Sequence, residues 1–368
     1  MASEKQMEDV YSGQVRAYGS KLLGVDSDGQ AQSDEEYAEL KRLIEEKGLM
    51  DRQPVFYIYK ITFTLGLLAA SLSLILILDN LWLHLLNAAL LGFAFGQTAS
   101  IAHDAGHNQI FNSTKRNNVV GLVVRFLVAV SKSWWVDQHG MHHRYTNDID
   151  LDPHNVLPIV AFSEEQASRT TGFLRGLIRY QAVYYVPLLF FESYGMRVIS
   201  VRFLLSERTL GYRLELLMMV VHFAMYFTAL SFVFGVWQMF LFVVVHQGVF
   251  GFYSASIFAP NHKGMPVNDE DTRRDFLRSQ VTSSRNLKGN SLVDFWYVGL
   301  NFQIEHHLFP SMPRNKLREA RIVVREFCMA RSISYYKTGV LQSIKDILQF
   351  LNQVGASRGT KPTGPVIE

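Results

Sequence analysis

Seven of the twelve histidines lie in three short clusters, and histidine is a common ligand of transition metals. The clusters are HDAGH with His103 and His107, HGMHH with His139, His142 and His143, and QIEHH with His306 and His307. Residues three or four positions apart share one face of a helix, so each cluster directs two or three imidazoles the same way. The sequence therefore predicts a metal centre assembled from three segments.

The number of clustered histidines limits which metal ions the site could bind, and how many. Imidazole suits zinc, copper, iron and nickel. Seven imidazoles exceed the positions of a tetrahedral zinc site and suffice for two metal ions, of which iron is the one that activates dioxygen. HDAGH has the histidine spacing of the zinc-protease motif HExxH, but Asp104 stands where that motif needs a glutamate as general base. The protease would also leave the other five histidines unexplained, so we set it aside.

Four apolar runs are long enough to place these clusters at a membrane. They cover residues 55–78, 81–102, 214–234 and 236–259, and a span needs about 20 apolar residues. Asp79 and Asn80 separate the first pair and Gly235 separates the second, so we expect two hairpins. The predicted fold is an all-α integral membrane protein of four transmembrane helices in two hairpins, with a cytosolic helical cap that carries the histidine-rich site.

Charge predicts the orientation of these spans. Apart from Lys60, every lysine and arginine lies before the first span, between the second and third, or after the fourth. By the positive-inside rule, both termini and all three histidine clusters are then cytosolic. The apolar stretches 119–130 and 183–191 are too short to span and are expected to be interfacial or buried in protein. We expect a polar, helical segment 1–50, a membrane domain 51–345 and a tail 346–368 whose end, from residue 355, is disordered.

Composition excludes several other classes of protein. The single cysteine, Cys328, rules out an internal disulfide and a cysteine-based zinc cluster. The net charge of +3, without a basic run interleaved with aromatic residues, gives no indication of nucleic-acid binding. No apolar segment near residue 1 resembles a cleaved signal peptide.

The three motifs together resemble those of a known family. HDAGH, HGMHHRYTN and QIEHHLFPSMPRNKL, with two hairpins between them, are similar to the three histidine boxes of membrane fatty acid desaturases over roughly residues 50–340. Gln303, in place of the first histidine of the third box, resembles the front-end group, which includes linoleoyl-CoA and delta-5/delta-6 desaturase-like enzymes. The resemblance implies a di-iron centre that uses O2 to introduce a cis double bond into a fatty acyl-CoA or an acyl-lipid.

The resemblance also implies a ligand set, with no catalytic residues beyond the metal ligands. Family members bind two irons through the box histidines and one more histidine after the last span, which His262 in APNHKG matches best. Gln303 lies one helical turn before His307, so its amide can approach a metal or support a ligand. The implied ligands are His103, His107, His139, His142, His143, His262, Gln303, His306 and His307.

Five further residues are candidates for supporting roles. Asp104 and Asn147 could hydrogen-bond metal-bound imidazoles, although helix capping and turn chemistry explain them equally well. Trp134, Trp135 and His246 could line an acyl tunnel, although tryptophan is also common at membrane interfaces. We expect His84 to be an interface residue, His222 to lie within a span, and His154 to be a loop residue or to support a ligand.

Partners follow from the same resemblance. Desaturation needs two electrons from outside, and the HPGG-type haem motif of a fused cytochrome b5 domain is absent from the sequence. A separate donor, ferredoxin-like or cytochrome b5-like with its reductase, is therefore expected, in the plasma membrane of a bacterium or the endoplasmic reticulum of a eukaryote, with membrane lipid around the spans. Two alternatives stay open, namely a di-iron acyl hydroxylase, acetylenase or conjugase, and a non-catalytic membrane protein that binds lipid or metal.

Overall fold

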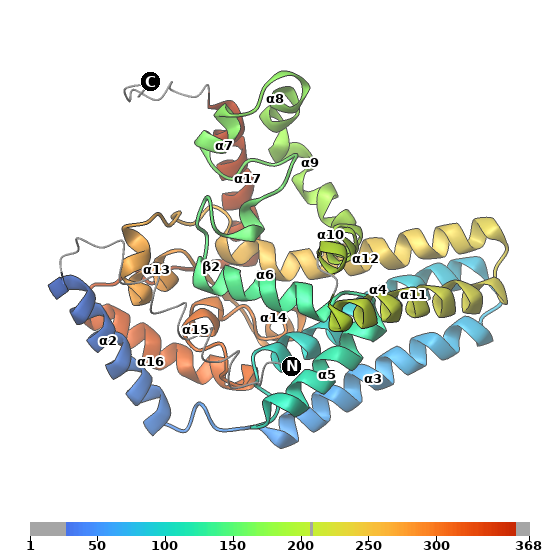
Figure 1. The fold of residues 1–368 in the computed structure, drawn as a ribbon, viewed down its shortest axis with the longest axis horizontal. Coiled ribbons are helices and arrows are strands. Elements are labelled where there is room, and N and C mark those ends of the chain that lie inside the picture. The colour runs from blue at the N-terminus through green and yellow to red at the C-terminus, as the bar shows by residue number, and fades with distance from the viewer. Residues whose placement is uncertain (1–26, 207–208, 358–368) are drawn as a thin grey trace.

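The computed structural model describes residues 27–206 and 209–357, and four of its helices are long and apolar enough to cross a membrane. These are α3 (Pro54–Ile77), α4 (Leu81–Gly106), α11 (Leu210–Ser231) and α12 (Val236–His262), which run along the long axis of the molecule (Figure 1). The four predicted spans and their two hairpins are therefore confirmed. Two helices continue past the predicted ends, since α4 includes His103 and α12 includes His262.

Local sequence explains where the hairpins turn. Asn80 ends the first connection, because its side chain accepts hydrogen bonds from the backbone N–H groups of Trp82 and Leu83. In the second hairpin, the side chain of Gln238 accepts a hydrogen bond from the N–H of Gly235. Both caps satisfy backbone donors at a helix N-terminus.

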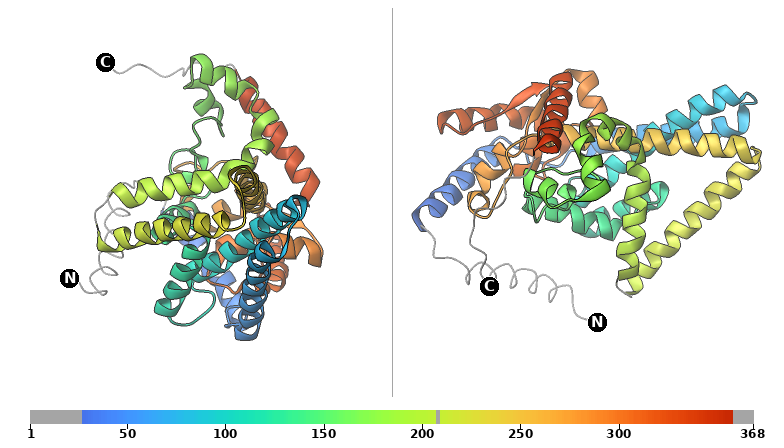
Figure 2. Two further views of the ribbon diagram at one scale, coloured as in Figure 1. Left: turned by 90° about the vertical axis from the view of Figure 1, so that its right-hand side faces the viewer. Right: turned by 90° about the horizontal axis from the view of Figure 1, so that it is seen from above.

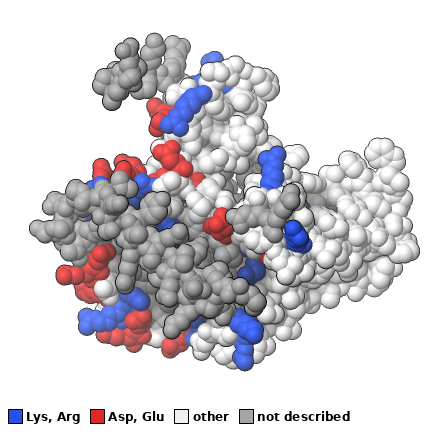
Figure 3. Space-filling model, viewed as in Figure 1, with Lys and Arg blue, Asp and Glu red and all other residues white. Residues whose placement is uncertain are grey.

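The two hairpins meet along α4 and α12. A Cβ atom added at Gly92 of α4 would lie 2.6 Å from the backbone oxygen of His246 on α12, so glycine allows the two backbones to approach closely. The helix α11 is far less buried, and it diverges from α12 towards α10 (Glu192–Ser206), as Figure 2 shows. The ends of the long helices carry no visible charge in the space-filling view (Figure 3), as expected of a surface in contact with lipid.

A bent pair of helices lies between the hairpins in sequence. The helix α5 (Thr114–Val128) packs along α4, and Ala129, with φ of 53°, turns the chain into α6 (Lys132–Arg144). The two helices meet at 109°, and if they count as one broken span, the number of candidate spans rises to five. The predicted short segment 119–130 therefore forms most of α5 and the turn that follows it.

We call the helices outside the two hairpins the cap. Beyond α5 and α6, most of them are short. The short ones are η1 (Pro153–Asn155), α7 (Glu164–Ser168), α8 (Gly172–Arg179), α9 (Gln181–Leu188), η2 (Leu189–Phe191), η3 (Thr272–Arg274), α13 (Phe276–Thr282), α14 (Ser291–Trp296), α15 (Gln303–Leu308) and η4 (Arg314–Lys316). The stretch 183–191 falls in α9 and η2, where Val183 and Phe191 are exposed and Tyr185 is buried. Two three-residue strands, β1 (Asn286–Lys288) and β2 (Lys337–Gly339), pair in parallel.

Longer amphipathic helices close the cap. The helix α2 (Ser27–Glu46) buries Leu40 and Ile44 against α16 (Leu317–Ala330), α13 and α15. The predicted polar helix before residue 50 is therefore present in the described part, whereas residues 1–26 lie outside it. The helix α17 (Val340–Ala356) crosses the predicted boundary at residue 345, and residues 358–368 of the predicted tail lie outside the described residues.

Candidate metal centre

Four histidines from three helices form what we call the first histidine group: His103, His107, His139 and His306. One ring nitrogen from each lies within 4.8 Å of the others. His103 lies in the last turn of α4 and His107 caps that helix, while α6 supplies His139 and α15 supplies His306. The C-terminal end of one candidate membrane-spanning helix and two cap helices therefore meet at one point.

Three more histidines form the second histidine group: His142, His262 and His307. They come from α6, the last residue of α12 and α15, and their ligand atoms satisfy the same limit of 4.8 Å. Adjacent residues on α15, His306 and His307, thus contribute to different groups. All three side chains of the second group are buried.

His143 lies between the two groups. Its Nε2 atom is 3.1 Å from Nε2 of His139 in the first group. Its ring stacks on that of His307 in the second group, with 4.3 Å between the ring centroids. The structure therefore brings together all seven clustered histidines and His262.

The short distances between imidazole nitrogens are explained better by a bound cation than by hydrogen bonds between neutral rings. Nε2 of His139 lies 2.8 Å from Nε2 of His107 and 3.1 Å from Nε2 of His143. A neutral ring nitrogen either donates one proton or offers one lone pair, so it cannot satisfy two such neighbours at once. A metal ion bound by all three lone pairs resolves this conflict.

Buried nitrogens without partners support the same conclusion. Among the described residues, Nε2 of His103, both ring nitrogens of His306 and Nε2 of His307 are buried and make no hydrogen bond. An unsatisfied buried polar atom costs about 1–3 kcal/mol, so several in one place call for a ligand. The donor set, nitrogen-rich and enough for two ions, fits transition metals such as iron.

The opposite ring nitrogens of the second group are held by the protein. Nδ1 of His142 faces Oδ2 of Asp152 at 2.9 Å, and Nδ1 of His307 faces Oε1 of Gln280 at 2.9 Å. Nδ1 of His262 lies 3.1 Å from the backbone oxygen of Ser283. Such hydrogen bonds fix the tautomer with the proton on Nδ1 and leave the Nε2 lone pair free to bind a metal.

One member of the first group has a comparable partner. Nδ1 of His103 lies 3.3 Å from Oδ1 of Asp104, whose other oxygen is 2.6 Å from Nε of Arg314. Arg314 also donates to Oγ of Ser100 and to the backbone oxygen of Val298. The segment after the third cluster thereby holds the carboxylate that orients a histidine of the first cluster.

Burial keeps these imidazoles in the neutral form that binds metals. Removal from water, reinforced by the neighbouring histidines, lowers the pKa values of His139, His143, His306 and His307 well below the usual range. A protonated imidazole has no lone pair, so the depressed pKa values favour metal binding at neutral pH.

Gln303 lies beside the second group. Its Nε2 atom is 3.0 Å from Nε2 of His262, and its Oε1 accepts a hydrogen bond from Asn261. The residue is 2 % exposed, so its amide faces the site rather than solvent. Its position therefore suits either a direct metal contact or support of His262.

The two tryptophans have different surroundings. Trp135 stacks on His139 with 4.3 Å between ring centroids, and the guanidinium of Arg125 lies 4.6 Å from the centroid of the Trp135 ring. Trp135 therefore forms a wall of the first group. Trp134 instead packs with Val128 and Leu230 in the apolar cluster between the hairpins.

The structure does not bring the other candidates into the two groups. Asn147 donates to the backbone oxygens of Met265 and Pro266, so it ties the α6 loop to the segment after α12. His246 lies in the middle of α12, sixteen residues before His262, and its Nδ1 pairs with the hydroxyl of Tyr226 at 2.8 Å. Sixteen residues of helix correspond to about 24 Å.

The weaker histidines are also separated from the groups, with one exception. His84 packs on Phe234 near the hairpin turns, and His222 packs on Phe95 and Phe126. His154 stacks on His142 and, with Asp152, completes a third cluster of ligand atoms within 4.8 Å. The exposed His154 ring therefore covers the second group.

Comparison with known proteins agrees with this site. The fatty acid desaturase family model matches residues 80–339, which is most of the chain. The chain belongs to the fatty acid desaturase family. Members of this family are oxidoreductases, and the histidine clusters are consistent with the family's metal site.

Curated relatives are distant desaturases. An Acyl-lipid (9-3)-desaturase of Physcomitrium patens is 27% identical over 87% of this chain and 62% of its own length. A Delta(8)-fatty-acid desaturase of Euglena gracilis is 29% identical, covering 91% of this chain and 82% of the relative. A Delta(6)-fatty-acid desaturase of Caenorhabditis elegans is 27% identical, covering 82% and 70%. The chain thus spans less than two thirds of the moss enzyme, and its relatives belong to the front-end group.

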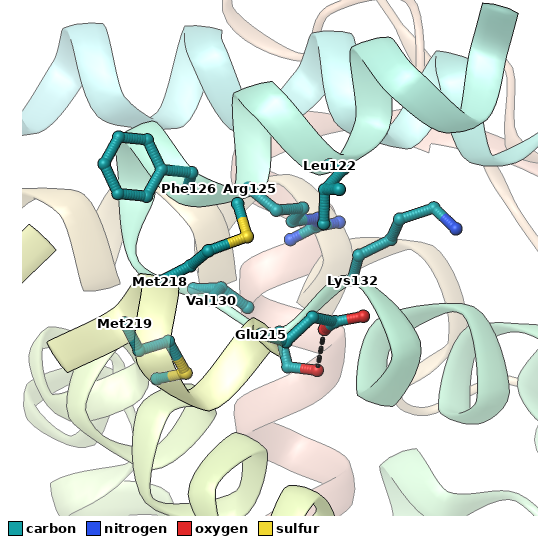
Figure 4. A pocket seen from close by; sticks show the side chains of 9 residues that line it. Leu122, Arg125, Phe126, Val130, Lys132, Glu215, Met218 and Met219 are labelled. Carbon is teal, nitrogen blue, oxygen red and sulfur yellow. Dashed lines mark hydrogen bonds between the residues drawn. The ribbon is translucent and has the colours of Figure 1, made fainter. Parts of the chain in front are cut away.

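In this desaturase-family chain, a buried carboxylate anchors the helix of the second box. Glu215 of α11 accepts hydrogen bonds from Oγ of Ser131, at 2.7 Å, and from both N–H and Oγ of Ser133. Figure 4 shows Glu215 beside Arg125 and Lys132 at a small cavity. Because α6 begins here, Glu215 fixes the start of the helix that carries the second histidine box.

Sequence reasoning missed several residues of this site, namely Asp152, Gln280, Ser283, Arg314 and Glu215. Asp152 alone carried a local signal, because it lies ten residues after His142 in an acidic stretch. The others are common residue types that reach the site from distant positions in the chain.

Proposed function

We propose that this protein is an O2-dependent front-end desaturase that introduces a cis double bond into a fatty acyl chain carried by CoA or by a lipid. The observation that carries the proposal is the meeting of eight buried or half-buried histidines, whose free ring nitrogens face one another, at one end of long apolar helices. Front-end relatives at 27–29% identity support the substrate class.

We assign the metal ligands by group. His103, His107, His139 and His306 would hold one iron, and His142, His262 and His307 would hold the other. His143 would complete the coordination between them, and Gln303 would contact the second iron or support His262. Two irons in these positions would supply the O2 chemistry needed to remove hydrogen from an unactivated methylene, which no side chain can do.

The chain's own residues would hold the ligands in place. Asp152, Gln280 and the backbone of Ser283 keep the protons of the second group on Nδ1. Asp104, held by Arg314, does the same for His103. Trp135 excludes water from one side of the first group by stacking on His139.

The location matches a substrate dissolved in the bilayer. Both groups lie at the ends of α4 and α12, and the wide exposed apolar surfaces of α3 and α11 face lipid. An acyl chain would enter from the bilayer while its head group stays at the charged surface, which we place in the cytosol together with both termini. Residues 51–345 would form the desaturase unit.

The balanced reaction requires an outside reductant. Two carbon–hydrogen bonds provide two electrons and two protons, and a separate donor provides two electrons, with two further protons taken from water. O2 accepts all four electrons and leaves as two molecules of water, while the substrate gains its double bond. The donor would be ferredoxin-like or cytochrome b5-like.

Expression in a desaturase-poor host tests the proposal. Cells fed linoleate or saturated acids should form an acyl product two mass units lighter than its precursor, and the His306→Ala variant should form none. A product sixteen mass units heavier would instead identify a hydroxylase. A protein that binds iron but consumes no O2 with any reductant would be a non-catalytic binder, and the proposal would be wrong.

A further inference from the structure

Four basic side chains on the cap form what we call the basic patch: Lys288, Arg321, Arg325 and Lys337. Arg321 and Arg325 are four residues apart on α16 and so share one face of that helix. Lys288 is on β1 and Lys337 is on β2, the two strands of the parallel pair. The patch therefore joins one helix face to the small sheet.

Among the residues that the structure describes, little negative charge lies close to this patch, apart from the buried Glu305 near Arg321. Among the described residues, none of its four side chains forms an ion pair, whereas the neighbouring Arg318 and Arg331 pair with Asp294 and Glu39. Burial, together with repulsion from Arg321, Arg325 and Lys288, lowers the pKa of Lys337. Four like charges kept together at a cost in self-repulsion indicate a surface that meets an anionic partner.

The patch lies directly behind the helix that carries the third histidine box. The guanidinium of Arg321 lies over the ring of Phe302, 5.5 Å from its centroid, and the backbone oxygen of Phe302 accepts from the N–H of His306. Lys337 pairs in register with Asn286, whose Oδ1 accepts from the N–H of Ile304 in α15. Two short chains of contacts therefore run from the patch to α15.

The position of the patch argues against a lipid partner. The helix α16 lies at the opposite end of the molecule from the apolar tips of the four long helices (Figure 1). Anionic lipid head groups attract cations close to the membrane surface, and their potential falls off within a Debye length of about 8–10 Å. A soluble anionic partner can reach α16 without this limit.

We propose that the basic patch is the docking surface for an acidic electron-transfer protein that reduces the metal centre, an inference that rests on the proposed function. Redox partners meet through small, transient and charge-steered interfaces, and four neighbouring basic side chains can steer an acidic partner in this way. Each docking event brings a one-electron carrier next to α15, so a turnover needs two events. One electron would pass from the reduced donor to the metal centre at each event, and the donor would leave oxidised.

Direct binding tests the docking surface without relying on activity. The full chain is placed in phosphatidylcholine nanodiscs, and the Kd is measured for a soluble, acidic cytochrome b5 domain and for a plant-type ferredoxin. The Arg321→Glu/Arg325→Glu and Lys288→Glu/Lys337→Glu variants should each weaken binding of the donor by about 10-fold or more. The second pair does not touch Phe302, so it separates docking from any disturbance of α15.

A matched control carries the same change of charge elsewhere. Lys115 and Arg116 are exposed at the start of α5 and form no ion pair among the described residues. The Lys115→Glu/Arg116→Glu variant should bind the donor as the wild type does. Equal Kd values for the wild type and both patch variants would overturn the proposal, as would a loss of binding seen equally in the control.

Two further measurements distinguish docking from a loss of catalysis and from lipid binding. Turnover driven by dithionite should stay at the wild-type level in both patch variants, while the KM for the donor rises. If the wild type is inactive with both dithionite and the protein donor, the proposed function is contradicted. The Kd comparison would still test the docking surface in that case. An effect of the patch variants confined to nanodiscs with anionic lipid would assign the patch to the membrane and overturn the proposal.

Discussion

The two histidine groups are built differently although they lie side by side. In the second group, each of the three imidazoles has a partner for Nδ1, from Asp152, Gln280 or the backbone of Ser283. In the first group, His306 has no partner for either nitrogen among the described residues, and the His103 contact with Asp104 is longer at 3.3 Å. The second group is therefore organised by the protein, whereas the first would depend more on the metal ion that we propose it binds.

Loss of a ligand should have the largest effect. Replacing His306 by alanine removes the ring that α15 contributes to the first group and leaves His103, His107 and His139 facing a void. We expect product formation to fall by at least about 100-fold, because metal sites lose affinity steeply when a ligand is removed. Fatty acid analysis of the expressing host measures this, with membrane insertion checked by fractionation.

The control for this ligand variant is His222→Ala. His222 is a histidine of α11 that packs on Phe95 and Phe126 outside both groups. It should keep near wild-type activity. Full activity in His306→Ala, or in the parallel His107→Ala, His143→Ala and His307→Ala variants, would refute the ligand assignment.

Substitution of the two supporting carboxylates, one beside each histidine group, should have different effects on metal affinity and stability. Asp152→Asn keeps the size of the side chain but weakens the hold on His142, so we expect iron affinity to fall by about 10–100-fold. Asp104→Asn should also destabilise the fold, because it leaves the buried Arg314 unpaired, and breaking a buried pair costs about 3–5 kcal/mol.

Chelator competition and thermal unfolding together distinguish these two variants. Asp152→Asn should lose iron to a chelator while its Tm in the metal-free state stays near that of the wild type. Asp104→Asn should have a clearly lower Tm even without metal. Equal Tm values for the two metal-free variants would contradict the role given to Arg314.

Gln303 should show an intermediate effect. Its amide lies 3.0 Å from Nε2 of His262, so Gln303→His can still offer a ligand nitrogen, whereas Gln303→Ala leaves a gap beside the second group. We expect the histidine variant to retain several-fold more activity than the alanine variant. The ratio of the two products in parallel cultures measures this, and a ratio near one would place Gln303 outside the metal environment.

Metal removal should increase hydrogen exchange more near the first group than near the second. This difference is the smallest effect that we expect. Hydrogen exchange compares the peptide that ends α4 at His107 with the peptide that ends α12 at His262. The α12 end stays tied to Ser283 through His262, so exchange should rise more at the α4 end. An equal rise at both ends would show that the outer partners do not organise the second group.

The sequence alone predicts the features that depend on neighbouring residues, namely the long apolar helices and the histidine clusters. Hydropathy located α3, α4, α11 and α12 within a few residues, because each span is set by its own composition. Helical spacing identified the clusters, since His139, His142 and His143 lie within one helix. It could not assign them to groups, because α6 and α15 each contribute to both groups and that division depends on tertiary packing.

The supporting residues were hidden for a different reason. Gln280 reaches His307 across 27 positions, and Arg314, in the segment after the third cluster, reaches Asp104 at the end of α4. A glutamine or arginine in a polar segment has no local pattern that marks it as a partner of a histidine. Two of the four long helices also end later than their apolar runs, because HDAG and PNH continue α4 and α12 beyond their last apolar residues.

The iron content of the purified full chain tests the central claim most directly. After loading with ferrous iron without oxygen and removal of the unbound metal, elemental analysis should find close to two irons per wild-type chain. His262→Ala should retain close to one, since the first group is left intact. A wild-type ratio near one or zero, or a ratio of two in a variant that lacks both His262 and His306, would contradict a centre divided between the two histidine groups.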